Sequence, residues 1–136
     1  MSGKGIWPSV SIVLDASAAL DIAVGLQPRL AMLLVGEDLH APMTFDVEVA
    51  SALRRLELTK VLTTEQVEAV RARLSPLAMA RHPPAPHLID VCWPWRHNIT
   101  IQDGVYVALA RMLRASLMTT DDRLAHAAAD LVTVLG

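Results

Sequence analysis

The sequence predicts an α/β domain in which helices pack on a mostly parallel sheet. Of the 136 residues 53% are hydrophobic, yet they include only three Trp, one Tyr and one Phe. A core must therefore be built from aliphatic side chains, which suits helices packed on a parallel sheet. Short apolar segments also alternate with segments that have the three- and four-residue spacing of a helix. The length allows one core and leaves no room for a second domain.

We expect residues 1–8 to be a flexible lead-in and residues 9–136 to form the single domain. Residues 1–7 lack the apolar core and the small-residue cleavage site of a signal peptide. The single Cys excludes an internal disulfide, and no apolar run reaches the roughly eighteen residues of a membrane span. The sequence therefore predicts a cytoplasmic protein without a membrane segment.

The charge balance excludes binding to nucleic acid by charge alone. Twelve Lys and Arg stand against fourteen Asp and Glu, which gives a formal net charge of −2. Four arginines on two predicted helices are interpreted as a solvated face, with a groove for a helical partner as the alternative. These are Arg54, Arg55, Arg71 and Arg73. If the partner is a polyanion, something must offset the acidic side chains.

Four short apolar segments and one brief extended segment, residues 79–82, are predicted to be strands. The first is rich in apolar residues, as in strands buried on both faces, and it ends directly before Asp15. The predicted strands are residues 10–14, 39–41, 79–82, 116–119 and 131–135.

Helical periodicity and capping signals predict the helices between these strands. One helix begins after Asp15, and Thr63 and Gln66 form a capping-box pattern at the start of another. The remaining predicted helices are residues 28–35, 44–58, 87–97 with a kink at Pro94, one from Thr100 that ends at Arg114 and Ala115, and a last one after Asp122.

The stretch from Thr100 to Leu124 organises the predicted fold as helix, strand and helix. Its apolar residues recur at helical spacing and predict one buried face: Ile101, Val105, Ala108, Leu109 and Met112. Ligands of an open α/β sheet bind beyond the carboxyl ends of the strands, so Asp121 at a strand end is a site candidate. Asp103, in the first turn of the preceding helix, reaches the same crevice if that helix starts at the same edge.

Four acidic residues occupy comparable places: Asp15 and Asp121 at strand ends, Asp103 in a first helical turn, and Glu48 at the rim of an apolar helix face. Helix capping explains Asp15, Asp103 and Asp121 individually. Glu48 is explained individually as an ordinary exposed helix residue, which either pairs with Arg55 or is favoured by the helix N-terminus. Capping does not explain why the four would converge.

Convergence of these acids predicts a metal site. If the strands are adjacent and parallel, the carboxylates meet at one edge and repel one another unless a hard divalent cation neutralises them. Mg²⁺ or Mn²⁺ suits such an all-oxygen site, where it lowers the pKa of a bound water and stabilises charge on a phosphate. Such a cation would also draw a phosphodiester to a protein with a net negative charge.

A zinc site is the rejected alternative. The chain has metal-ligating residues at a constant spacing of five: His82, His87, Cys92 and His97. Five helical residues rotate a side chain by about 140°, so neighbouring members do not share one metal. Trp93 and Trp95 are interpreted as packing residues rather than as a ligand platform.

Four segments carry a resemblance that spans nearly the whole chain. They are Asp15-Ala16-Ser17-Ala18, Glu48 within residues 44–58, Gln102-Asp103-Gly104-Val105-Tyr106-Val107-Ala108-Leu109-Ala110, and Leu117-Met118-Thr119-Thr120-Asp121. Their order and spacing resemble the PIN-domain ribonucleases, specifically the small single-domain toxins of the VapC type. The last two segments together are fairly specific to that family.

The resemblance implies a three-layer PIN-like fold, with a central, mostly parallel sheet of four to five short strands flanked by helices. The implied catalytic acids are Asp15, Glu48, Asp103 and Asp121. All but Glu48 are implied as metal ligands. Ser17 and Thr119 would orient the acids by hydrogen bonds. Asp122 is a further supporting residue and leaves open which of two neighbouring carboxylates faces the metal, although Asp121 keeps the family's T-x-D spacing.

The activity that the resemblance implies is cleavage of RNA by a Mg²⁺- or Mn²⁺-dependent endoribonuclease, leaving 5′-phosphate and 3′-hydroxyl ends. It further implies a homodimer and a cognate antitoxin whose tail occludes the site, often with an arginine. Two departures are Ser51, where a polar amide often follows the family's Glu, and Arg114-Ala115 in place of a glycine.

Two other functions are weighed against the toxin. The first is a non-catalytic PIN-like domain that binds RNA or protein. The second is a phosphotransferase of the haloacid dehalogenase type, which begins with a strand-end Asp. It ranks last because that family needs a second acid two residues later, where this chain has Ser17.

Overall fold

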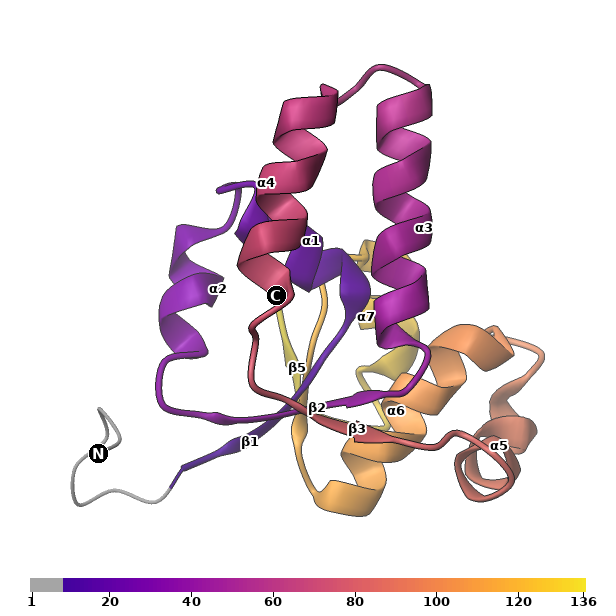
Figure 1. The fold of residues 1–136 in the computed structure, drawn as a ribbon. Helices are drawn as coiled ribbons and strands as arrows, with labels where there is room; N and C mark the ends of the chain where they lie inside the picture. Colours follow the sequence, from indigo (N-terminus) through magenta and orange to yellow (C-terminus); the bar gives the residue numbers. More distant parts are fainter. Residues whose placement is uncertain (1–8) are drawn as a thin grey trace.

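A five-stranded sheet lies at the centre of the computed structural model, which describes residues 9–136 (Figure 1). The strands are β1 (Ser11–Leu14), β2 (Asp38–Pro42), β3 (Ala80–His82), β4 (Ser116–Met118) and β5 (Val134–Leu135). Their order across the sheet is β3-β2-β1-β4-β5, and all four neighbouring pairs are parallel. The prediction of a mostly parallel sheet of four to five short strands is confirmed. The predicted lead-in, residues 1–8, lies outside the described residues.

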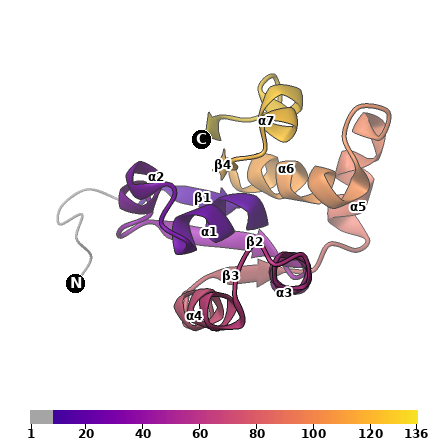
Figure 2. The same ribbon diagram turned by 90° about the horizontal axis from the view of Figure 1, so that it is seen from above.

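Helices cover both faces of this sheet. They are α1 (Ala16–Ala23), α2 (Pro28–Leu33), α3 (Phe45–Leu58), α4 (Thr64–Leu74), α5 (His87–Cys92), α6 (Ile101–Leu113) and α7 (Asp122–Ala128). In Figure 1 α1 and the hairpin of α3 and α4 rise above the sheet, whereas α6 runs from its right side to below it and α5 lies at the right beside α6. Helix α6 packs on β1, β2 and β4, and α5 packs on α6. Figure 2 shows the same arrangement from above, with α1 over β1. The three-layer α/β class is confirmed.

Local signals placed most element boundaries within a few residues. The capping box of Thr63 and Gln66 is present, with both reciprocal hydrogen bonds formed at the start of α4. The segment predicted as one kinked helix divides at the expected place, because α5 ends at Cys92 and Trp93–Trp95 form a short 3₁₀ turn around Pro94. Strand β5 is shorter than predicted, since the amides of Leu131 and Val132 bond to the end of α7 instead.

Helix α6 contains a long stretch of buried residues. Residues 104–110 are all buried, which follows from packing between the sheet and α5. At Gly104 a Cβ would lie 2.9 Å from the Cβ of Cys92, so this glycine allows the close approach of α5. The prediction for Met112 is wrong. Its side chain is 45% exposed, because no described element covers that face at the last turn of α6.

Arg114 closes α6 in a conformation that usually belongs to glycine. Its φ of 53° and ψ of 39° are left-handed. Arg114 therefore makes the chain reversal into β4 in a conformation that costs an arginine backbone energy that a glycine would not lose.

Candidate active site

Two strand ends meet at one edge of the sheet. Strands β1 and β4 are adjacent and parallel, with Leu14 opposite Met118, and the Asp15 amide donates to the Met118 carbonyl at 2.9 Å. Asp15 therefore follows β1 at the same level at which Thr119 follows β4. This is the shared edge that the convergence of the acids requires.

Asp15 is buried at this edge and held by two hydroxyl groups. Asp15 is only 6% exposed. Its Oδ2 accepts hydrogen bonds from Ser17 Oγ at 2.5 Å and from Thr119 Oγ1 at 2.8 Å. Asp15 occupies the N-cap position of α1 but makes no side-chain cap hydrogen bond there. Capping therefore does not account for Asp15. Burial raises the pKa of its carboxyl group against the lowering effect of both hydroxyls, and the charge of Asp121 raises it further.

Glu48 enters the same site from α3 and is fixed by a tyrosine. The Tyr106 hydroxyl donates to Glu48 Oε2 at 2.6 Å, while Oε1 is buried and has no hydrogen-bond partner among the described residues. Burial and the bond to Glu48 raise the pKa of Tyr106, which keeps the phenol protonated as the donor. Glu48 is therefore neither an ordinary exposed side chain nor a partner of Arg55.

Tyr106 was not predicted as a site residue. It is the only tyrosine of the chain and stands in α6 three residues after Asp103. On a helix that spacing places both side chains on neighbouring parts of one face. A polar aromatic residue inside an otherwise apolar helix was the signal that could have found it.

Asp103 lies half-buried in the first turn of α6. Its amide donates to Thr100 Oγ1 at 3.1 Å, so Thr100 caps the helix. Burial raises the pKa of the Asp103 carboxyl group most, followed by repulsion from Asp15, and smaller repulsions come from Asp121 and Glu48. All three other acids are thus close enough to oppose its ionisation.

Asp121 both caps a helix and faces the site. Its Oδ1 accepts from the amides of Arg123 at 3.0 Å and Leu124 at 3.2 Å, so the capping interpretation is confirmed for α7. The Asp121 amide in turn donates to Thr119 Oγ1, which connects it to Asp15. The structure does not bring Asp122 to the same place, since that side chain is exposed in the first turn of α7.

One open cavity of about 410 Å³ joins the four acids. Asp15, Glu48, Asp103 and Asp121 all line it, although they come from four separate elements. Ser17 lines it as well, whereas Thr119 lies buried behind Asp15. The cavity wall also includes Ser51, Arg55 and Gln102. The structure thus brings the four predicted acids to one concave surface.

The donor set of the cavity suits a hard divalent cation. It offers four carboxylates that repel one another, and Glu48 Oε1 is buried without a partner among the described residues. Among residues 9–136, however, no group of three or more His, Cys, Asp or Glu side chains is positioned to hold a metal ion as it stands. The residues fit Mg²⁺ or Mn²⁺ in type, and binding would require them to move closer together.

The residues of the rejected zinc pattern lie in unrelated environments. His82 bonds to His40 of the neighbouring strand, with 2.9 Å between Nε2 and Nδ1. The Cys92 thiol is buried and donates to the Ile89 carbonyl at 3.5 Å. Trp95 packs against the core, whereas Trp93 is exposed. The Arg96 guanidinium stacks over the Trp93 ring, 4.7 Å from its centroid.

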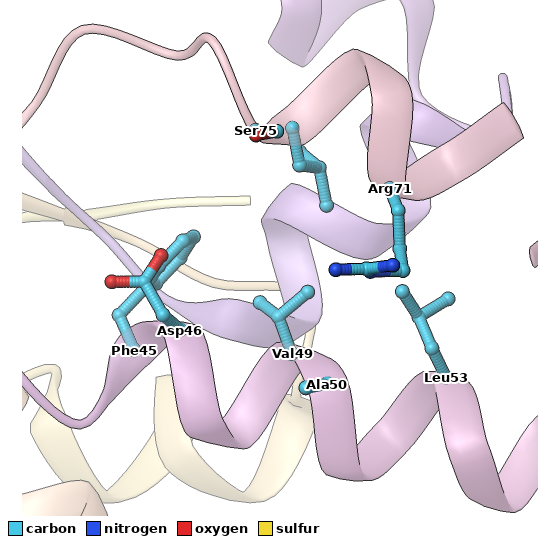
Figure 3. Close-up of a pocket in the computed structure, with 8 residues that line it drawn as sticks. Phe45, Asp46, Val49, Ala50, Leu53, Arg71 and Ser75 are labelled. Atoms are coloured by element: carbon cyan, nitrogen blue, oxygen red, sulfur yellow. The ribbon is translucent and has the colours of Figure 1, made fainter. Parts of the chain in front are cut away.

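A smaller hollow of about 150 Å³ lies between α3 and α4 (Figure 3). Its wall is largely apolar, and in Figure 3 Arg71 extends from α4 toward Val49 and Leu53 of α3. The one carboxylate in it, Asp46, accepts two hydrogen bonds from Arg81, at 2.6 and 2.9 Å. The acid of this hollow is therefore already paired, unlike the four acids that line the larger cavity.

Known proteins are similar to this chain in sequence, and solved structures are similar to it in fold. The chain is 41% identical over 118 residues to ribonuclease VapC1 of Mycobacterium tuberculosis, a match that covers 85% of this chain and 89% of the relative. The chain belongs to the VapC ribonuclease family. Two other members from M. tuberculosis are ribonuclease VapC3, 35% identical over 88% of this chain and 89% of its own length, and VapC12, 37% identical over 85% and 90%. No family model matches the chain.

Solved structures agree with the VapC assignment at the level of the fold. The structure of PAE2754 from Pyrobaculum aerophilum has a TM-score of 0.64 at 19% identity and covers 88% of this chain and 87% of its own. FitAcB from Neisseria gonorrhoeae has a TM-score of 0.58 at 20% identity, covering 92% and 96%. The resemblance to the VapC-type PIN-domain ribonucleases is confirmed. In the part of the chain described here, no helix is long and apolar enough to cross a bilayer.

Proposed function

We propose that this VapC family member is a metal-dependent endoribonuclease that acts as the toxin of a toxin-antitoxin pair. The observation that carries the proposal is the single cavity lined by Asp15, Glu48, Asp103 and Asp121 from four separate elements. The relatives named ribonucleases support RNA as the substrate. The expected products carry 5′-phosphate and 3′-hydroxyl ends.

Each side chain has a role in this proposal. Asp15, Asp103 and Asp121 would hold Mg²⁺ or Mn²⁺, which when bound supplies an activated water and stabilises charge on the phosphate. Ser17 and Thr119 fix the orientation of the Asp15 carboxylate through their hydroxyl groups. Asp122 is exposed in the first turn of α7 and does not line the cavity, so the proposal gives it no part.

We assign to Glu48 the acceptance of a proton from the attacking water. Tyr106 donates to its Oε2 and so fixes the carboxylate, while Oε1 is buried without a partner among the described residues and would have to turn toward the cavity to reach that water. Tyr106 is thus a positioning residue for Glu48.

The protein partners of the proposal follow from the family. Membership of the VapC family supports a cognate antitoxin as inhibitor, and a homodimer and a cytoplasmic location are further expectations of the same proposal. A second candidate function, a non-catalytic RNA- or protein-binding domain, is favoured by one observation. That observation is the absence, within residues 9–136, of acids already positioned to hold a metal.

Loss of one acid from the cavity should abolish cleavage while the fold persists. We expect Asp15→Asn or Asp103→Asn to lower the rate of Mn²⁺-dependent cleavage of an RNA substrate by about a thousandfold, since several kcal/mol of transition-state stabilisation are lost. Asp46→Asn is the matched control, because it removes an acid from the first turn of α3 outside the cavity. It should leave cleavage unchanged.

Cation binding provides a second measurement that does not depend on activity. Mn²⁺ at a hundredfold excess over its dissociation constant should stabilise the wild-type protein by about 2.7 kcal/mol. The Asp46→Asn variant should gain the same amount and Asp103→Asn much less. Cleavage by both cavity variants at the wild-type rate would refute the assigned roles, and a wild-type protein that neither binds Mn²⁺ nor cleaves RNA would favour the non-catalytic domain.

A further inference from the structure

One face of α3 leads from the carboxylate cavity to a second hollow further along the helix. Glu48, Ser51 and Arg55 are spaced by three and four residues, so they lie along the same side of α3. Seven residues of helix rise about 10 Å, which places Arg55 roughly that far along α3 from Glu48. This row of residues therefore runs along α3 from the acids toward the end of the helix at Leu58.

The second hollow, which we call the arginine hollow, has a volume of about 330 Å³. It is lined by Ser51, Arg54, Arg55, Leu58 and Thr59. Ser51 and Arg55 also line the carboxylate cavity, so the two hollows adjoin. The arginine hollow contains two guanidinium groups and no carboxylate, the opposite charge to the cavity beside it.

The two arginines of this hollow are free to bind a ligand. Both are exposed, and within residues 9–136 neither side chain forms an ion pair or a hydrogen bond. Nearby arginines differ. Arg71 pairs with Glu68 at 3.8 Å, Arg73 donates to the Ala23 carbonyl at 2.5 Å, and Arg81 binds Asp46. The arginines of this hairpin that remain free within residues 9–136 therefore lie beside the acids.

An RNA strand bound at the cavity needs cationic side chains for the phosphates next to the cleaved bond. A protein of net charge −2 with four carboxylates around its cavity repels the phosphates on either side of the one being cleaved. A cation between the acids would offset charge at the reacting phosphate only. Arginine is the side chain best matched to a phosphate, because its planar guanidinium donates two parallel hydrogen bonds.

We propose that the arginine hollow binds backbone phosphates of the RNA strand next to the cleaved bond, with Arg55 as the main contact and Arg54 as the second. This inference rests on the proposed function for the identity of the ligand. It assigns to Arg55 a positioning role and gives the strand a direction, along α3 from the carboxylate cavity toward the loop after Leu58. An acidic segment of a protein partner is the competing occupant.

Binding of a fluorescein-labelled, single-stranded oligouridylate tests the inference. Affinity is measured by fluorescence anisotropy in EDTA, which prevents cleavage, at several salt concentrations. We expect Arg55→Gln to weaken binding roughly tenfold, as for loss of a hydrogen bond to a charged group. It should also reduce the slope of log affinity against log salt by about 0.7, the value for one ionic contact to a single strand. Arg55→Lys should keep the slope, because it keeps the charge.

Arg71→Gln is the matched control, since it removes an exposed arginine of the same hairpin that lies outside the arginine hollow. It should change neither affinity nor slope. Equal effects of Arg55→Gln and Arg71→Gln would overturn the inference, and so would an unchanged affinity of Arg55→Gln, which would leave the hollow to a protein partner. Because the substituted residues are exposed, the melting temperatures should stay within a degree or two of the wild type.

The binding assay and the cleavage assay can fail separately. A wild-type protein that cleaves RNA while Arg55→Gln binds as tightly as wild type retains the proposed function and loses this inference. A wild-type protein that binds oligouridylate through Arg55 but cleaves no RNA with Mn²⁺ loses the proposed function and retains the arginine hollow as a phosphate site.

Discussion

Asp46 and Glu48 stand two residues apart in the first turn of α3, yet their surroundings are opposite. Asp46 lies toward α4 and accepts two hydrogen bonds from Arg81. Glu48 lies toward α6, where a neutral phenol occupies one oxygen and the other is buried without a partner. One carboxylate is neutralised by an arginine, and the other adds its charge to three further acids.

The pKa of Asp46 is lowered, whereas the pKa values of Asp15 and Asp103 in the cavity are raised, because only Asp46 has a cationic partner. The hydrogen bonds from Arg81 lower the pKa of Asp46. Burial and neighbouring acids raise the pKa of Asp15 and of Asp103. Gathering uncompensated carboxylates does not stabilise a fold, and this is the reason for proposing that the cavity takes a cation. The paired acid, by contrast, is explained by the fold alone.

The largest effect is expected where the phenol holds Glu48. Tyr106→Phe removes the donor to a part-buried carboxylate and should lower the free energy of unfolding by about 2 kcal/mol. Urea denaturation at neutral pH measures it. Adding Glu48→Gln to Tyr106→Phe should recover part of the loss, because an uncharged amide tolerates burial better. A cost near zero for Tyr106→Phe would mean that Glu48 is solvated, and the contrast with Asp46 would disappear.

A smaller effect of opposite sign is expected at Asp103. Its pKa in the folded protein lies above its ordinary value of 3.8, so the folded state binds more protons than the unfolded state between the two values. Stability therefore falls as pH rises through this range. Without divalent cations, Asp103→Asn should raise the free energy of unfolding at pH 7 by about 1 kcal/mol or less, and the gain should vanish near pH 3.

Asp46→Asn should show the reverse dependence. Because Arg81 lowers the pKa of Asp46, the stabilising pair is present above pH 3.8 and is lost as pH falls through the lower, folded-state value. Denaturation at pH 7 and pH 3 compares the two variants. A destabilised Asp103→Asn at pH 7 would contradict the proposed repulsion between the acids.

The smallest effect is expected from Arg81→Gln. The side chains of Arg81 and Asp46 are 31% and 55% exposed, so water screens their attraction. We expect a loss of about 0.5 kcal/mol at low salt and none at high salt. A loss above about 2 kcal/mol would show that the pair is buried and organises the hairpin, and the distinction between a structural and a functional acid would need revision.

Local patterns predicted the parts of this site that depend on strand ends and helix starts. Asp15 and Asp121 follow apolar strands, and parallel pairing of those strands was enough to place both at one edge. The capping role of Asp121 also explains why Asp122 points away, although the two residues were hard to distinguish from spacing alone.

Contacts between distant elements could not be read from spacing. The bond between Glu48 and Tyr106 joins residues 58 positions apart, and it depends on how α3 is set against α6. The exposure of Met112 depends on where neighbouring elements end, which helical periodicity does not encode. Arg54 and Arg55 look like any solvated pair in the sequence until the fold places them beside the acids.

Gly104 shows how tightly packing and chemistry are joined in this domain. Glycine inside a helix costs roughly 0.5–1 kcal/mol relative to alanine, so a search for stabilising substitutions would select this position first. Alanine there would bring a methyl group within 2.9 Å of Cys92 and push α5 away from α6, the helix that carries Asp103 in its first turn. Selection for thermal stability alone would therefore favour changing Cys92 to a smaller residue before Gly104 could grow, and libraries that vary the two positions independently would miss the compatible pairs.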